Sequence, residues 1–196
     1  MPIPVVDAPL DPGDALRLVA RRHWLAWLRI RWQVAPEVLR EAGSLYWPIY
    51  LIRARVVYRP ALRRPVQLRW LGAVDGVTGR AGNAEIRVPP RVLRDVDPAQ
   101  VIPSRYAQEQ ILQTWRVFAR RFVEVRYKPV EIRELSVEDL EHCYLPYCVV
   151  VGAGKTYLID CLMRRVDPLS ELPELDFFFA GGPPERDSAS DFGKGE

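Results

Sequence analysis

Two stretches between residues 50 and 70 alternate between apolar and polar side chains, and this pattern limits the possible folds more than any other feature. Every second position of the first stretch is apolar: Tyr50, Ile52, Ala54, Val56 and Tyr58. Arginine occupies positions 53, 55 and 59 between them. Successive side chains of a β-strand point to opposite faces, so this alternation predicts a strand with one buried face and one charged face.

The segments after this strand predict an antiparallel meander. The sequence ALRRP at 61–65 can turn the chain, and residues 66–70 alternate again, with Val66, Leu68 and Trp70 on the apolar side. The sequence DGVTG at 75–79 is typical of a tight turn, because glycine tolerates the positive φ angles that such turns need. Residues 84–88 can then return as a third strand.

Two amphipathic segments predict helices that can cover such a sheet. Asp11 or Asp14 can cap the first helix, and Ser104 can cap the second. The apolar stripe of the first is Leu16, Ala20, His23 and Trp27. The apolar stripe of the second is Ala107, Ile111, Trp115, Phe118 and Phe122. Each stripe repeats at helical spacing, and Arg116 and Arg120 form a basic pair outside the second stripe.

The chain after the second helix predicts short elements. Residues 122–127 alternate like a strand, and residues 136–142 predict a short acidic helix that starts at Ser136. The apolar run 143–151 predicts a buried strand, and GAGK at 152–155 predicts the turn that follows it.

The order of features in the first half of the chain recurs in the second half. Each half has a helix, a connector, a Tyr-x-Pro segment, a strand, a turn and a strand. The two Tyr-x-Pro segments begin at Tyr46 and Tyr144, 98 residues apart. Proline fits the start of a strand because it cannot donate a hydrogen bond to a neighbouring strand. The sequence therefore predicts an α+β fold of two similar helix-plus-antiparallel-hairpin units, which can join into one sheet.

This order of features predicts five regions of the chain. They are an extended arm at 1–13, a first α+β unit at 14–88, a proline-rich linker at 89–103, a second α+β unit at 104–167 and an acidic, partly disordered tail at 168–196.

The VDGVTG turn at 74–79 and the two Tyr-x-Pro strand entries resemble those of PepSY-like domains, a family of small α+β modules. About twenty residues carry this resemblance. Most members of that family are regulatory or binding modules, so the resemblance implies a binding role and no catalytic residues. The second half departs from the pattern, since it has GAGK where the first half has the VDGVTG turn.

The charge distribution predicts a basic binding surface. The formal net charge is +3, but residues 168–196 hold seven acidic and two basic residues, which leaves the rest of the chain strongly basic. Four arginines share the polar side of the predicted strands, and two more lie at the hairpin tip. These six candidate partner-binding residues are Arg53, Arg55, Arg59, Arg69, Arg63 and Arg64. An anionic partner, or the acidic tail itself, can cover such a face.

Motifs for catalysis and metal binding are weak. GAGKT at 152–156 resembles the end of a phosphate-binding loop, but Val149 stands where the first glycine of that motif belongs. A β-turn is therefore favoured there, with a small nucleotide-binding protein or enzyme as an alternative. The spacing of Cys143, Cys148 and Cys161 beside His142 matches no standard zinc site, so buried thiols are favoured. His23 is expected to be a buried side chain, and no cofactor or metal is expected.

These features together predict a non-catalytic interaction or assembly protein that binds an acidic protein partner, for example within a multi-subunit complex. Nucleic-acid binding through the same arginines is the alternative, because guanidinium groups also bind phosphates. The chain has no apolar run long enough to span a membrane and does not begin like a secretory signal. With three cysteines that form no disulfide framework, a cytoplasmic location is expected.

Overall fold

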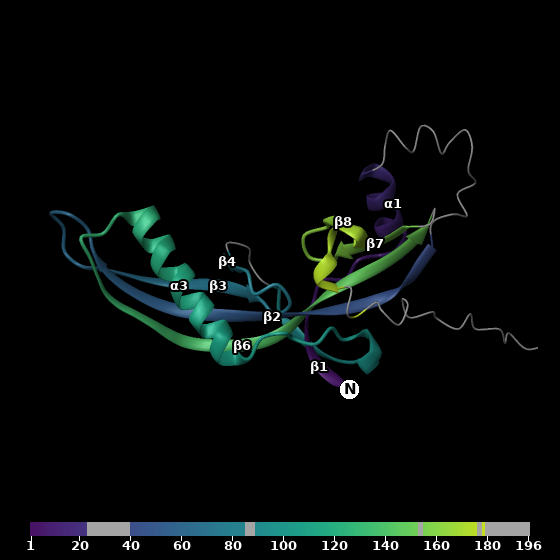
Figure 1. The fold of residues 1–196 in the computed structure, drawn as a ribbon, viewed down its shortest axis with the longest axis horizontal. Coiled ribbons are helices and arrows are strands. Elements are labelled where there is room, and N and C mark those ends of the chain that lie inside the picture. The colour runs from purple at the N-terminus through teal and green to yellow at the C-terminus, as the bar shows by residue number, and fades with distance from the viewer. Residues whose placement is uncertain (23–39, 85–88, 153–154, 176–177, 179–196) are drawn as a thin grey trace, which may run out of the picture. The chain divides into compact units, whose positions relative to one another are not determined.

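The computed structural model describes residues 1–22, 40–84, 89–152, 155–175 and 178. Its longer helices are α1 (Pro12–Arg22) and α3 (Gln108–Tyr127) (Figure 1). Its strands are β1 (Pro2–Val6), β2 (Arg40–Arg59), β3 (Val66–Asp75), β4 (Ala81–Asn83), β5 (Arg91–Asp95), β6 (Glu131–Gly152), β7 (Lys155–Asp160) and β8 (Val166–Pro168). Short 3-10 helices are η2 (Pro98–Gln100), η3 (Leu169–Glu171) and η4 (Pro173–Leu175). The fold is α+β, as predicted.

The eight strands form one mixed sheet. Its main order is β4-β3-β2-β6-β1-β5, and β7 and β8 continue from β6. Strand β1 runs antiparallel to β5, whereas its bridge to β6, between Val5 and Tyr144, is parallel. The predicted β2–β3 hairpin is confirmed, with Tyr50 opposite Val74 and Tyr58 opposite Val66.

The chain forms two compact units. Unit 1 comprises Met1–Ala8 and Tyr46–Pro146, and unit 2 comprises Pro9–Leu45 and Tyr147–Glu196. Each unit therefore combines segments from both halves of the sequence. Strands β2 and β6 are each long enough to contribute to both units. The predicted boundaries of the α+β units, at 14–88 and 104–167, stay predictions.

The core of unit 1 lies between α3 and one face of β2 and β3, across which α3 runs (Figure 1). The apolar side of β2 is buried as its alternation predicts, and Ile52 and Ala54 pack with Ile111 and Trp115 of α3. The predicted helical stripe continues further than expected. Val123 is buried one turn beyond Ala119, so residues 122–127 belong to α3 and do not form a strand.

Three other segments differ from the sequence predictions because tertiary pairing decides their structure. Residues 2–6 of the predicted arm form β1, whose Ile3 and Val5 are buried. Residues 91–95 of the predicted linker form β5, which pairs along the whole of β1. Residues 136–142, expected as a short helix, lie within β6. In each case the hydrogen bonds come from a distant strand, which local sequence does not reveal.

The turn that follows β3 is built around Asp75. The carboxylate of Asp75 accepts hydrogen bonds from the backbone N–H groups of Val77, at 2.7 Å, and Thr78, at 3.0 Å. The backbone N–H of Asp75 donates to the carbonyl of Arg80, at 2.9 Å. Gly79 has a φ of +69°, a value that glycine adopts readily.

The turn that follows β7 has the same construction around Asp160. Its carboxylate accepts hydrogen bonds from the backbone N–H groups of Leu162, at 2.8 Å, and Met163, at 2.9 Å. Its backbone N–H donates to the carbonyl of Arg165, again at 2.9 Å. The residue with positive φ is Arg164, at +53°.

The beginning of the predicted tail is ordered within unit 2. Residues 166–168 form β8, and the 3-10 helices η3 and η4 follow it. Leu175 is fully buried. The rest of the tail, apart from residue 178, lies outside the described residues, as does His23.

Candidate interaction surfaces

Three of the four predicted sheet arginines already have carboxylate partners within the chain. The polar side of β2 and β3 faces away from α3, as expected. There Arg55 binds Glu134 at 2.5 Å, Arg59 lies 3.5 Å from Glu131, and Arg69 lies 3.6 Å from Glu138. All three glutamates belong to β6. Arg55, Arg59 and Arg69 are therefore paired within the chain, and the role of this face in binding a partner stays a prediction.

The pKa of Glu134 reflects its position on this face. Hydrogen bonds from Ser136 and then from Arg55 hold this pKa below its usual value, because both favour the charged carboxylate. The structure thus gives Arg55 a definite intramolecular role.

The other three predicted binding residues are exposed. Arg53 lies on β2, and Arg63 and Arg64 lie in the β2–β3 connection. Among the described residues, none of these three has a carboxylate within ion-pair distance. Their role in binding a partner stays a prediction, and the structure does not gather them with the other three into one unpaired basic face.

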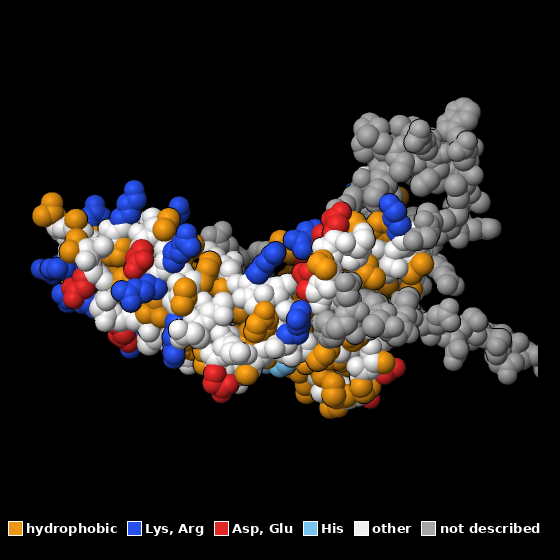
Figure 2. Space-filling view, viewed as in Figure 1, with side chains coloured by type: hydrophobic (Ala, Val, Ile, Leu, Met, Phe, Trp, Pro, Cys, Tyr) orange, Lys and Arg blue, Asp and Glu red, His pale blue; other side chains and the backbone are white. Residues whose placement is uncertain are grey.

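A second basic surface lies on the outer side of α3. It consists of Arg116, Arg120, Arg121 and Arg126, all exposed. Arg120 pairs with Glu124 one turn later, at 3.1 Å. No carboxylate of the described part of the chain lies within ion-pair distance of the other three. Figure 2 shows Lys and Arg side chains gathered over this helix.

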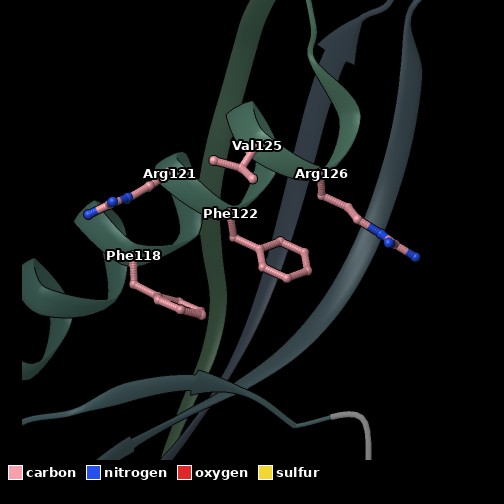
Figure 3. Close-up of a pocket in the computed structure, with 5 residues that line it drawn as sticks. All are labelled: Phe118, Arg121, Phe122, Val125 and Arg126. Carbon is pink, nitrogen blue, oxygen red and sulfur yellow. The ribbon is translucent and has the colours of Figure 1, made fainter.

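A hollow of about 420 Å³ lies beside the C-terminal half of α3. Its lining residues are Phe118, Arg121, Phe122, Val125 and Arg126. The two phenylalanine rings point in the same direction from the helix, and the two arginines extend to either side of them (Figure 3). The hollow therefore combines an apolar floor with two cations, an arrangement that suits a ligand with an apolar body and negative charge.

The aromatic floor of the hollow is held by β3. The ring of Phe122 stacks on Trp70, with centroids 4.6 Å apart and an interplanar angle of 28°. The indole N–H of Trp70 donates a hydrogen bond to the side chain of Asn83, at 2.5 Å. Trp70 also packs against Trp115 at 4.8 Å. These contacts hold the ring of Phe122 in position.

Apolar side chains are also exposed next to the basic surface. Val117 and Val125 on α3 are 60% and 67% exposed, and Val130 just beyond the helix is 62% exposed. The sequence predicted the inward stripe of α3 but not this outer surface. The sequence signal for this surface is the set of arginines on α3, of which only the pair Arg116 and Arg120 is predicted.

The segment that resembled a phosphate-binding loop is part of a β-hairpin. Gly152 at the end of β6 pairs with Lys155, which is the first residue of β7. A phosphate-binding loop of that type leads into a helix, whose N-terminus helps to bind the phosphate. A strand follows here, so the segment lacks the helix of that motif, and the nucleotide-binding alternative at 152–156 stays a prediction. Residues 153–154 lie outside the described residues.

The three cysteines are buried thiols. Burial raises the pKa of Cys143 to about 11. His142 is half-buried and stacks on Tyr50, with centroids 4.5 Å apart, and burial lowers its pKa. The part of the chain that the structure describes contains no group of three or more histidine, cysteine or carboxylate side chains able to hold a metal ion.

Comparisons with protein-family models, with curated proteins and with solved structures find no match. The resemblance to PepSY-like modules therefore stays a prediction. Within the described residues, no helix combines the length and the apolar character that crossing a membrane requires.

Proposed function

We propose that this protein is a non-catalytic interaction or assembly component that binds an acidic protein partner through the outer side of α3. The observation that carries the proposal is the set of Arg116, Arg121 and Arg126, which have no carboxylate within ion-pair distance among the described residues. Two of them, Arg121 and Arg126, also line the aromatic hollow. Arginine and aromatic side chains are enriched in the residues that contribute most to protein–protein binding.

The paired sheet face is a weaker candidate for the same role. A partner's carboxylate would have to compete with Glu131, Glu134 or Glu138 for each guanidinium group. On α3, Arg121 and Arg126 are available without such competition, and the exposed apolar residues beside them add area that a partner can bury.

Nucleic-acid binding remains the second candidate, because four exposed arginines on one helix can also bind successive phosphates. The two candidates differ in their response to salt. Binding to phosphates releases condensed counterions, so its affinity falls steeply as the salt concentration rises. The affinity of a complex that depends on buried apolar area falls much less with salt.

The test compares two charge-reversal variants of the full chain. Arg121→Glu with Arg126→Glu changes the α3 surface, and Arg63→Glu with Arg64→Glu makes the same change of charge in the β2–β3 connection. Bait protein is used to isolate partners from the cells of origin, with and without nuclease. We expect the α3 variant to lose a bound acidic protein that the control variant retains.

Two outcomes oppose the proposal. Equal loss in both variants would mean that net charge, and not the α3 surface, holds the partner. Recovery of nucleic acid by the wild-type chain, with binding to a defined single-stranded DNA that disappears at high salt, would favour the second candidate.

We also propose that the chain contains two copies of one α+β unit, at about residues 5–83 and 101–168. Equivalent positions make equivalent contacts: Val5 has a parallel bridge to Tyr144, and Tyr46 has a parallel bridge to Val101. A helix follows in each copy, starting at Pro12 in the first and at Gln108 in the second.

The two aspartate turns support the same proposal. Asp75 lies opposite Ile49, and Asp160 lies opposite Tyr147, so the turns face positions that are 98 residues apart, as Tyr46 and Tyr144 are. An aromatic residue donates to each carboxylate: Trp47 through its indole N–H at 2.9 Å, and Tyr147 through its hydroxyl at 3.4 Å. Strands β4 and β8 then pair back in the same register relative to the turns.

In this arrangement the helix of each copy packs on strands of the other copy. Helix α3 of the second copy packs on β3 and β4 of the first, and α1 of the first copy contacts β8 of the second. A protease site inserted between β4 and β5 tests this exchange in the full chain. We expect the cut halves to stay together on size exclusion and to separate only in denaturant. Separation under native conditions, with each half retaining its helix content, would refute the exchange.

A further inference from the structure

Cys148 and Cys161 lie side by side in unit 2, with their Sγ atoms 3.5 Å apart. Cys148 is on β6 directly opposite Ile159 of β7, and Cys161 follows Ile159 by two residues. Side chains two apart on a strand share a face, which brings both sulfurs to the same side of the hairpin. We propose that this pair is a disulfide-forming site, oxidised by a small disulfide of the glutathione type.

The movement needed to form the bond is small. The S–S bond length is about 2.05 Å, so the two sulfurs must approach by about 1.5 Å. The pairing of β6 with β7 ends at Tyr147 and Asp160, and Cys161 follows that last pair. Its backbone therefore lies in the turn after the strand, where an adjustment does not break the register of the hairpin.

The reaction is two successive thiol–disulfide exchanges. One cysteine thiolate attacks a sulfur of glutathione disulfide, forming a mixed disulfide and releasing one glutathione thiolate. The second cysteine loses its proton to solvent and attacks the protein sulfur of the mixed disulfide, and the second glutathione leaves. Overall, two protein thiols are oxidised to one disulfide, and one glutathione disulfide is reduced to two glutathione molecules.

The environment makes this reaction slow at neutral pH. The hydrogen bond with Cys148 and burial raise the pKa of Cys161, and the nearby charge of Asp160 adds to this effect. Because the thiolate is the attacking species, the rate should increase with pH. Both side chains are also buried, which further limits the access of the oxidant.

Cys143 provides an internal control. It belongs to unit 1, where it is buried in a cluster with Val6 and Leu51. No other cysteine belongs to that cluster as the structure describes it. Oxidation should therefore leave one thiol in each chain.

The experiment treats the full chain with glutathione disulfide at pH 7 and at a higher pH, then unfolds and alkylates it for mass spectrometry. We expect a product about 2 Da lighter than the reduced chain before alkylation. It should carry one alkylated thiol, at Cys143, and a peptide pair that joins Cys148 to Cys161. The oxidised chain should also unfold at a temperature several degrees higher, because the cross-link restricts the unfolded chain.

The variant Cys148→Ser should accumulate a mixed disulfide and form no internal bond, and Cys143→Ser should behave as the wild type does. Three results would overturn the proposal: three reactive thiols after prolonged oxidation at the higher pH, a stable glutathione adduct on the wild-type chain, or a cross-link that includes Cys143. None of these results bears on the α3 surface, because the two inferences use different residues.

Discussion

Replacing Gly72 by alanine should weaken the packing of α3 on the sheet of unit 1. A Cβ atom at this position would lie 1.9 Å from Cη2 and 2.0 Å from Cζ3 of Trp115. Carbon atoms in contact normally lie about 3.5–4.0 Å apart, so the indole must move by about 1.5–2 Å. Trp115 is fully buried and its ring lies 4.8 Å from that of Trp70, so we expect the movement to displace Trp70 or α3 itself.

The expected loss of stability follows from two limits. Overpacking a core by one methyl group costs about 1–3 kcal/mol, and losing the whole packing of a buried tryptophan costs about 3–5 kcal/mol. Displacement of the Trp115 indole lies between these cases, so Gly72→Ala should lower the free energy of unfolding by about 2–4 kcal/mol. The midpoint of urea unfolding should fall by about 1–2 M.

Urea titrations followed by circular dichroism and by tryptophan fluorescence measure this effect. Gly82→Ala is the matched control, because a Cβ there meets no atom within 4 Å. It should change the free energy of unfolding by less than about 0.5 kcal/mol. Adding Trp115→Leu to Gly72→Ala should cost less than the sum of the two single changes, since the smaller side chain makes room. A Gly72→Ala chain as stable as the wild type would refute this account of the α3 contact.

Three further perturbations test other contacts. Burial disfavours protonated His142 and lowers its pKa, so the unfolded chain binds more protons than the folded chain below the usual value near 6.5. The contribution of His142 to stability should therefore be complete above that pH and fall as the solution is acidified. His142→Gln should flatten this part of a pH series of urea titrations. Asp75→Ala removes the acceptor of two backbone N–H groups and should lower the free energy of unfolding by about 2–3 kcal/mol, measured by thermal unfolding. A similar loss for Asp160→Ala would agree with the proposed duplication. A negligible loss for either variant would oppose it. Arg55→Ala should cost less than about 1 kcal/mol in the same assay because its ion pair is partly exposed, and a larger loss would mean that the pair with Glu134 is structurally essential.

The sequence predicted those elements whose side-chain period is complete within one segment. The alternation at 50–58 identified the buried face of β2, and the stripe from Ile111 to Trp115 identified the inner side of α3. Each pattern reports burial directly, because a residue's place along the period decides which face it occupies. The end of α3 was not predicted because residues 122–127 fit both the strand period and the helix period. The burial of Val123, one turn after buried Ala119, shows that these residues continue the helix.

The same difference between local pattern and distant contact applies to the candidate surfaces. Sequence identified arginines that share one face of a strand, but ion pairing depends on the neighbouring strand. Only residues 143–151 of the partner strand β6 were predicted as a strand, because residues 136–142, which include Glu138, have an acidic, helix-like composition. The hollow on α3 was missed for a related reason, since its shape depends on Trp70 of β3 behind Phe122.

By itself, then, the sequence determined the α+β class, the inner faces of β2 and α3, and the position of the Asp75 turn. These features depend on contacts between residues that are near in the chain or on the choice between water and core at each position. Only the tertiary structure decided that residues 2–6 and 91–95 are strands, that three sheet arginines are neutralised, and that two cysteine sulfurs meet. Those outcomes depend on hydrogen bonds, charges and contacts supplied from elsewhere in the chain, and no local pattern encodes which distant segment supplies them.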